Sequence, residues 1–201
     1  MQAVFFGKKG RMSALYLEGD IRVPVTKVDL MPYEILRTKS VEKDGYTTSV
    51  VGFGRRSTKR LNQPLLGQLK NFITDNFTFR FIREIQEPAK EAIVVGDMLE
   101  IRAVSKGKGW AGVVRKWGFH GGPKTHGQSD RERAPGSIGQ TTTPGRVYKG
   151  KKMGGRMGGE KVYVKNLKVV AVEDEGKTLF VKGAIPGHTG TVVEIAKVKK
   201  I

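Results

Sequence analysis

The sequence predicts a mainly β fold, either a barrel or a sandwich of short strands, which is interrupted by a long irregular segment. Short runs of β-branched and aromatic residues occur in both halves of the 201-residue chain. Between these runs the composition changes: residues 105–160 hold 15 of the 27 glycines, and no leucine occurs between Leu99 and Leu167. Residues 118–160 have too few large apolar side chains to offset their ordering entropy, so we expect them not to fold alone.

The first half is predicted to contain six strands and one helix. Because Pro24 lacks an N–H, the strand that contains it is predicted to lie at an edge or to carry a bulge. Apolar residues at helical spacing predict a helix at Pro64–Phe72, after a basic loop at residues 54–62. The predicted strands are Ala3–Phe6, Ala14–Leu17, Ile21–Val28, Tyr46–Phe53, Phe77–Ile85 and Asp97–Val104.

Strand character returns only after residue 160. A loop as long as the intervening one normally counts against its assignment to a compact domain, but it fits if the segment folds against a partner. The strands predicted in the second half are Val162–Val164, Lys168–Val172, Thr178–Val181 and Thr191–Ile195.

The charge of the chain is strongly positive and unevenly distributed. The chain holds 37 Lys and Arg against 19 Asp and Glu, which gives a formal net charge of +18. Residues 1–100 carry 16 cations and 12 acids, whereas residues 101–201 carry 21 and 7. Such a balance attracts polyanions, so nucleic acid or an anionic membrane surface is the expected partner.

The absence of several signals narrows the class of protein. No apolar run reaches the roughly 18 residues needed to span a bilayer, and the run at Ala3–Phe6 is too short for a signal peptide. Cysteine is absent, which excludes disulfides and thiolate metal sites. His120, His126 and His188 have few acidic neighbours, so we expect no metal there. The expectation is a soluble, intracellular protein without membrane partner, metal, cofactor or small-molecule substrate.

Cations, glycines and aromatic rings together predict where the chain binds RNA. Lys and Arg neutralise phosphates, glycines let the backbone approach closely, and rings stack on bases. Trp110 is expected to pack against the mouth of the barrel, whereas Phe119 and Tyr148 either pack or stack on a base or sugar. The predicted RNA-binding residues are Arg55, Arg56, Lys59, Arg60, Lys106, Lys108, Arg115, Lys116, Phe119, His120, Lys124, His126, Arg131, Arg133, Arg146, Tyr148, Lys149, Lys151, Lys152 and Arg156.

Two glycine-rich stretches imitate nucleotide-binding loops. Gly107–Gly112 has the glycine spacing of a dinucleotide loop and follows a predicted strand, but no second strand precedes Asp130, the acid at the required distance. Gly145–Lys151 has the spacing of a P-loop, but Lys152 replaces the Ser or Thr that would hold magnesium. Neither stretch is therefore expected to bind a nucleotide cofactor.

A series of motifs runs through the chain in order. They are Gly7-Lys8-Lys9, Pro24-Val25-Thr26, Asp44-Gly45-Tyr46, Asn62-Gln63-Pro64-Leu65-Leu66-Gly67, Ser105-Lys106-Gly107-Lys108-Gly109-Trp110, Thr125-His126-Gly127, Pro135-Gly136-Ser137-Ile138-Gly139, Pro144 to Met153, Asn166-Leu167 and Val181 to Gly187. Nearly the whole chain thereby resembles the bacterial-type large-subunit ribosomal protein L-three (uL-three) family. The chain departs from this family at Trp110, where phenylalanine is usual, in residues 128–133, and at Thr142, where some members carry a methylated glutamine.

The resemblance implies a fold and a function. It implies a β-barrel like that of translation factors, with a small α+β part that we assign to residues around 54–96. Residues 1–104 and 161–201 would form this globular body, and residues 105–160 a basic extension that penetrates RNA. The family resemblance further implies a cytoplasmic structural protein, not an enzyme, that binds large-subunit ribosomal RNA early in assembly beside neighbouring ribosomal proteins.

The tip of the extension is predicted from its length. A hairpin-like excursion from residue 118 to residue 160 has its midpoint at residue 139, where a stretch without charge lies between flanking cations. The resemblance implies that this end reaches toward the peptidyl transferase centre. The predicted tip residues are Gly139, Gln140, Thr141, Thr142, Thr143, Pro144 and Gly145.

Two other functions remain as alternatives. The glycine loops suggest a nucleotide-dependent enzyme acting on RNA, which a pocket with perturbed acids would support. The charge alone suggests a protein that compacts DNA or RNA, which a preference for duplex DNA over ribosomal RNA at matched salt would support.

Overall fold

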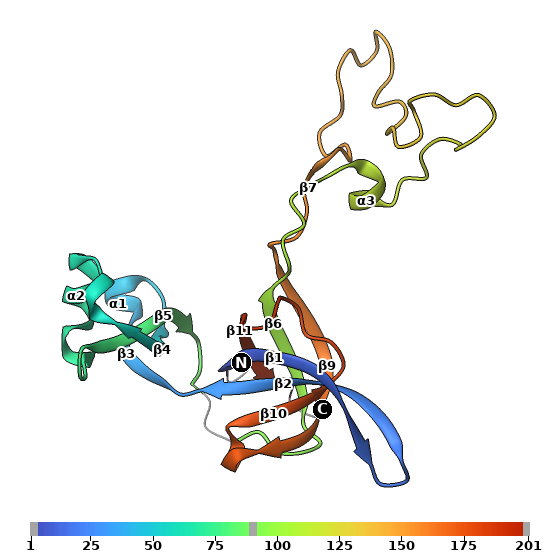
Figure 1. The fold of residues 1–201 in the computed structure, drawn as a ribbon. Helices are drawn as coiled ribbons and strands as arrows, with labels where there is room; N and C mark the ends of the chain where they lie inside the picture. The colour runs from blue at the N-terminus through green and yellow to red at the C-terminus, as the bar shows by residue number, and fades with distance from the viewer. Residues whose placement is uncertain (1–3, 89–91, 199–201) are drawn as a thin grey trace. The chain divides into compact units, whose positions relative to one another are not determined.

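Six antiparallel strands close into a barrel-like ring in the order β1-β11-β6-β9-β10-β2 (Figure 1). This computed structural model describes residues 4–88 and 92–198. The mainly β class predicted from the sequence is confirmed. The strands of the ring are β1 (Val4–Leu17), β2 (Ile21–Met31), β6 (Met98–Val104), β9 (Lys161–Glu173), β10 (Thr178–Lys182) and β11 (Val192–Lys197).

The interior of the ring is filled by aliphatic side chains. On β6 the residues Leu99, Ile101 and Ala103 are buried at the period of two that places alternate side chains on one face of a strand. Facing strands contribute further side chains that are completely buried, so one continuous core holds the ring. These further residues are Val28, Val169, Leu179, Val181, Val193 and Ile195.

The pairing of β1 with β2 corrects two predictions. The structure has one continuous strand β1 where the sequence predicted two, and the bulge lies in β1, between Lys9 and Met12. The strand β2 pairs on both sides, so its prediction as an edge strand is wrong. The pairing of β2 with β10 ends at Val25, which lies opposite Lys182, the last residue of β10. Pro24 lies just beyond this last pair, so its missing N–H is tolerated, and its carbonyl oxygen accepts a hydrogen bond from Gly183 N.

A separate three-stranded sheet has the order β3-β4-β5. The strand β3, in which no residue is buried, was not predicted, because a mostly exposed strand gives little hydrophobic signal. The helix α2 is shorter than the predicted helix and is followed by a 3-10 turn. The elements are β3 (Tyr33–Lys39), α1 (Val41–Asp44), β4 (Thr48–Ser57), η1 (Thr58–Arg60), α2 (Gln63–Leu69), η2 (Lys70–Phe72) and β5 (Phe77–Ile85).

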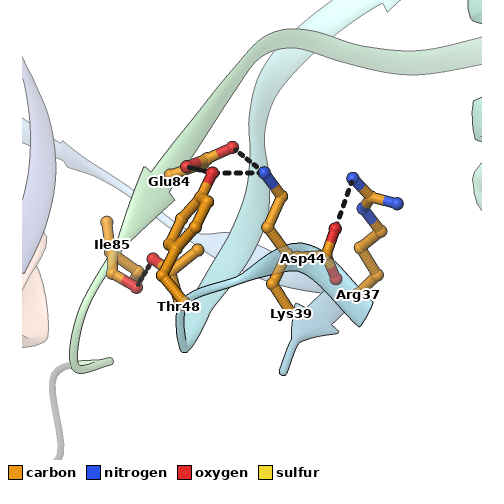
Figure 2. A network of polar contacts seen from close by, with 7 residues as sticks. Arg37, Lys39, Asp44, Thr48, Glu84 and Ile85 are labelled. Carbon is orange, nitrogen blue, oxygen red and sulfur yellow. Dashed lines mark hydrogen bonds and ion pairs between the residues drawn. The ribbon is translucent and has the colours of Figure 1, made fainter. Parts of the chain in front are cut away.

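Polar contacts join all three strands of this sheet (Figure 2). Lys39 on β3 lies 2.8 Å from Glu84 on β5, and the hydroxyl of Tyr46 donates to Glu84 Oε2 over 2.9 Å. Hydrogen bonds from Lys39 and from Tyr46 hold the pKa of the Glu84 carboxyl below its usual value. The bonds that Lys39 makes with Glu84 and Tyr46 raise the pKa of its ammonium in turn.

The chain divides into two compact units. One comprises the residues up to Val104 and from Lys161 onward, which we call the body, and the other is Ser105–Glu160, which we call the glycine-rich unit. The glycine-rich unit contains β7 (Trp110–Ala111), α3 (Val113–Trp117) and β8 (Gly155–Arg156). The remaining element, η3 (Asp174–Gly176), lies in the body. Within the glycine-rich unit, which the structure describes completely, only Ala111 and Val113 are buried.

Candidate nucleic-acid interface

The two ends of the glycine-rich unit form an antiparallel stem, which we define as residues 105–111 and 154–160. Ser105 N donates to Glu160 O, and Lys108 N donates to Met157 O, each over 2.9 Å. The strands β7 and β8 extend this pairing, with Trp110 opposite Arg156. Gly158 is required in the stem, because it has a positive φ of 74° and a Cβ there would lie 2.1 Å from the carbonyl oxygen of Lys106.

A groove of about 380 Å³ lies along the stem, and we call it the stem groove. Three predicted RNA-binding residues, Lys106, Lys108 and Lys116, meet there, although they are not adjacent in sequence. Throughout the described residues, none of these three lysines has a carboxylate within ion-pair distance. The complete lining is Ser105, Lys106, Lys108, Lys116, Trp117, Met157, Gly158 and Glu160.

The short helix α3 positions Trp117 at this groove. Its indole Nε1 donates a hydrogen bond to the carbonyl oxygen of Met153 over 2.7 Å, which fixes the ring. The ammonium groups of Lys116 and Lys152 lie 5.2 Å and 5.6 Å from the centre of the ring, within the range of cation–π attraction. Trp117 is not among the residues predicted to bind RNA, although its place directly after Arg115 and Lys116 was a signal for it.

Beyond α3 the chain forms a first loop, residues 119–135. Gly122 N donates to Glu132 O over 2.8 Å, so the loop closes on itself, and Lys124 lies 3.9 Å from Glu132. The predicted RNA-binding residues His120, Lys124, His126, Arg131 and Arg133 are all exposed on this loop.

A second loop, residues 137–151, carries the predicted tip. Gly145 N donates to Thr141 O over 3.3 Å, and the tip residues line most of an open hollow of about 490 Å³. The sequence predicted a hairpin-like excursion with its midpoint at residue 139. In the structure the first loop closes on itself through the bond between Gly122 and Glu132 before residue 139 is reached. The cations Arg146, Lys149, Lys151 and Lys152 follow the tip and are exposed.

The predicted RNA-binding residues of the body lie elsewhere in the chain. Arg55 and Arg56 are exposed at the end of β4, and the Arg55 guanidinium lies 3.8 Å from the centre of the Phe77 ring. Lys59 is exposed on η1. The side chain of Arg60 is outside the described part of the structure.

The aromatic residues of the glycine-rich unit differ in exposure. Trp110 is 77% exposed and lies opposite Arg156 in the stem, and its packing against the mouth of the barrel stays a prediction. Tyr148 is 57% exposed and Phe119 is partly buried, so both rings are accessible to a partner.

Neither imitation of a nucleotide-binding loop has the required structural context. The dinucleotide pattern needs a parallel strand after its helix, but α3 has five residues and the next strand, β8, is antiparallel to β7. The stretch Gly145–Lys151 contains no strand or helix. In the part of the chain that the structure describes, no three His, Asp or Glu residues are grouped as metal ligands. No helix there has the length and apolar character needed to cross a membrane.

Comparisons with known proteins agree with the resemblance found in the motifs. The family model described as "Ribosomal protein L3" matches residues 66–179. The chain is 42% identical to the large ribosomal subunit protein uL3 of Dehalococcoides mccartyi, over 96% of this chain and 97% of that protein. It is 39% identical to the protein of the same name from Herpetosiphon aurantiacus, over 96% and 95%, and 38% identical to that from Chlorobium limicola, over 96% and 98%. The chain belongs to the ribosomal protein L3 family.

Proposed function

We propose that the chain is a structural constituent of the large ribosomal subunit and that its glycine-rich unit binds large-subunit ribosomal RNA. The observation that carries the proposal is the mismatch between charge and core in residues 105–160. This unit has 12 Lys and Arg, three Asp and Glu, and two buried residues. A segment that buries so little and repels itself so strongly gains stability when a polyanion neutralises it.

The arrangement of the cations supports RNA as the polyanion. The single ion pair found within the unit, which the structure describes in full, is the weak surface contact between Lys124 and Glu132. Among the described residues, the remaining cations of the unit have no carboxylate within ion-pair distance, so they are available to phosphates. The left-handed glycines of the loops let the backbone approach a nucleotide chain where a Cβ would obstruct it.

The finer parts of the proposal follow from the family. The body is a barrel of the translation-factor type, the protein binds early in assembly, and it acts in the cytoplasm beside other large-subunit proteins. The second loop carries the tip, residues 139–145, toward the peptidyl transferase centre. Members of this family are structural ribosomal proteins rather than enzymes, so peptide-bond formation belongs to the RNA.

Competition between nucleic acids tests this function. The full chain is bound to a fluorescent large-subunit RNA fragment and is displaced by unlabelled ribosomal RNA or by duplex DNA with the same number of phosphates, at one salt concentration. The proposal requires ribosomal RNA to displace the probe at a lower concentration than DNA. Equal displacement would instead favour a general nucleic-acid-compacting protein, because phosphate contacts alone do not distinguish the two polyanions.

A further inference from the structure

We infer that the stem groove binds one unpaired RNA nucleotide, with its phosphate on the lysines and its base against Trp117. This inference rests on the proposed function, because it names the nucleic-acid element that one part of the glycine-rich unit recognises. A duplex alone would leave the aromatic wall of the groove unused, since paired bases are stacked within the helix.

The lysines of the groove form a candidate anion site. Lys106 and Lys108 come from one side of the stem and Lys116 from α3, and no ion pair within the described chain neutralises any of them. Glu160 is the one acid in the lining, so the groove keeps a positive excess. Like charges held together in this way attract a phosphate and lose their mutual repulsion when it binds.

The backbone around these lysines is shaped by glycine. A Cβ on Gly155 would lie 3.0 Å from the Lys116 ammonium, so the absence of a side chain leaves room for this cation. Gly158 lines the groove itself and brings the two sides of the stem into contact at Lys106. The groove is therefore a defined part of a hydrogen-bonded stem and not a gap between unrelated loops.

Trp117 supplies a surface for a base. The hydrogen bond from its indole to Met153 O holds the ring in place before any ligand binds, which lowers the entropy lost on binding. Trp117 as a residue is 42% exposed, so part of its surface remains free for contact. The volume of the groove, about 380 Å³, is in the lower part of the range of about 300–1,000 Å³ usual for small-ligand sites.

Tryptophan fluorescence of the full chain tests this inference directly. The chain has two tryptophans, so in the variant Trp110→Phe the signal comes from Trp117 alone. The probes are two RNA hairpins with one bulged residue, identical in phosphate number, of which one carries a base at the bulge and the other is abasic. The base-containing hairpin should quench Trp117 and bind about tenfold more tightly than the abasic one, the size expected for stacking of one base.

A pair of charge variants tests the role of the lysines. Lys108→Gln removes a cation of the groove and should reduce the tenfold preference for the base-containing hairpin. Lys124→Gln removes one cation from the first loop of the same unit and should weaken both hairpins by the same factor.

The possible results separate this inference from the proposed function. Equal affinities for the two hairpins, with no difference in quenching, would overturn the nucleotide site while RNA binding stands. If neither hairpin bound and ribosomal RNA fragments did not bind either, both the nucleotide site and the proposed function would be overturned.

Discussion

The indole of Trp117 and the carbonyl of Met153 are joined by a hydrogen bond of 2.7 Å across 36 positions of the chain. This bond connects the end of α3 to the chain that re-enters the stem, so it closes the base of the two loops. Beyond it no residue of the loops is buried. We therefore expect order in the free protein to be highest in the stem and to decrease in the loops.

Loss of this hydrogen bond should loosen the base of the loops. In Trp117→Phe the ring remains but the donor to Met153 O is lost, so we expect faster amide hydrogen exchange within residues 112–118. Trp110→Phe is the matched control, because Trp110 is largely exposed. Equal exchange in the two variants would show that the bond does not stabilise this region.

Gly158→Ala should open the stem. Its Cβ would lie 2.1 Å from Lys106 O, in addition to the cost of a positive φ of 74°. Gly159→Ala is a close control, because Gly159 has a φ of 72° but no atom within 4 Å of the added Cβ. The backbone strain of about 1–2 kcal/mol is common to both variants. Amide exchange at Lys108 and Met157 should therefore be faster in Gly158→Ala, and an equal rate in Gly159→Ala would contradict the clash.

Truncation in the ring should destabilise the body. Ile101 is completely buried in the main core, so Ile101→Ala should lower the free energy of unfolding by about 2–5 kcal/mol. Val162→Ala, at a 38% exposed position of β9, should cost less than about 1 kcal/mol. Urea unfolding followed by circular dichroism measures both values, and similar losses would mean that the ring interior is not the core.

The three-stranded sheet should lose stability in acid through Glu84. The pKa of Glu84 in the folded protein lies below its usual value of 4.5. Its contribution to the stability of the folded protein is therefore present above pH 4.5 and is lost as the pH falls through the folded pKa. Lys39 has a raised pKa, so its contribution is present below pH 10.5 and is lost as the pH rises through the folded value. The difference in unfolding free energy between the protein and Glu84→Gln should shrink below pH 4.5. If this difference stayed constant from pH 7 to pH 3, the pair of Glu84 and Lys39 would not be the cause of the loss of stability in acid.

Substitutions in the second loop should separate two roles. Bulky or charged replacements of Thr142 or Gly145 should change peptidyl transfer, or its sensitivity to inhibitors, in fully assembled subunits. Arg146→Ala and Lys151→Ala should instead lower the yield of assembled subunits, because each removes a phosphate contact. If tip variants kept normal peptidyl transfer and a normal response to inhibitors, the proposed position of the tip near the peptidyl transferase centre would be wrong.

Most of the ring could be predicted from the sequence because its strands alternate between buried and exposed side chains. In the ring, β6 ends at the predicted Val104 and β10 begins at the predicted Thr178. The strand β3 was missed because it buries no residue, and β1 was divided in two because Gly10 resembles a turn signal but lies within the strand.

The stem groove could not be predicted in the same way. Its lysines were recognised from composition, but their meeting with Trp117 depends on the pairing of residues 105–111 with 154–160. That pairing carries almost no hydrophobic pattern, because glycines and cations make up most of it. The first loop was missed for a related reason: its closure depends on one backbone hydrogen bond, between Gly122 and Glu132.

We expect the glycine-rich unit to provide most of the contacts to ribosomal RNA. Val104 and Lys161 are paired across β6 and β9, so a short Gly/Ser turn can join them and replace residues 105–160. A retained cooperative thermal transition in this variant verifies that its body still folds. The measurement is the slope of log K against log salt for a large-subunit RNA fragment, in the full chain and in this variant. The slope should be steep in the full chain and smaller by several units in the variant, because each phosphate contact contributes close to one unit. Equal slopes in the two proteins would show that the contacts to RNA lie mainly in the body.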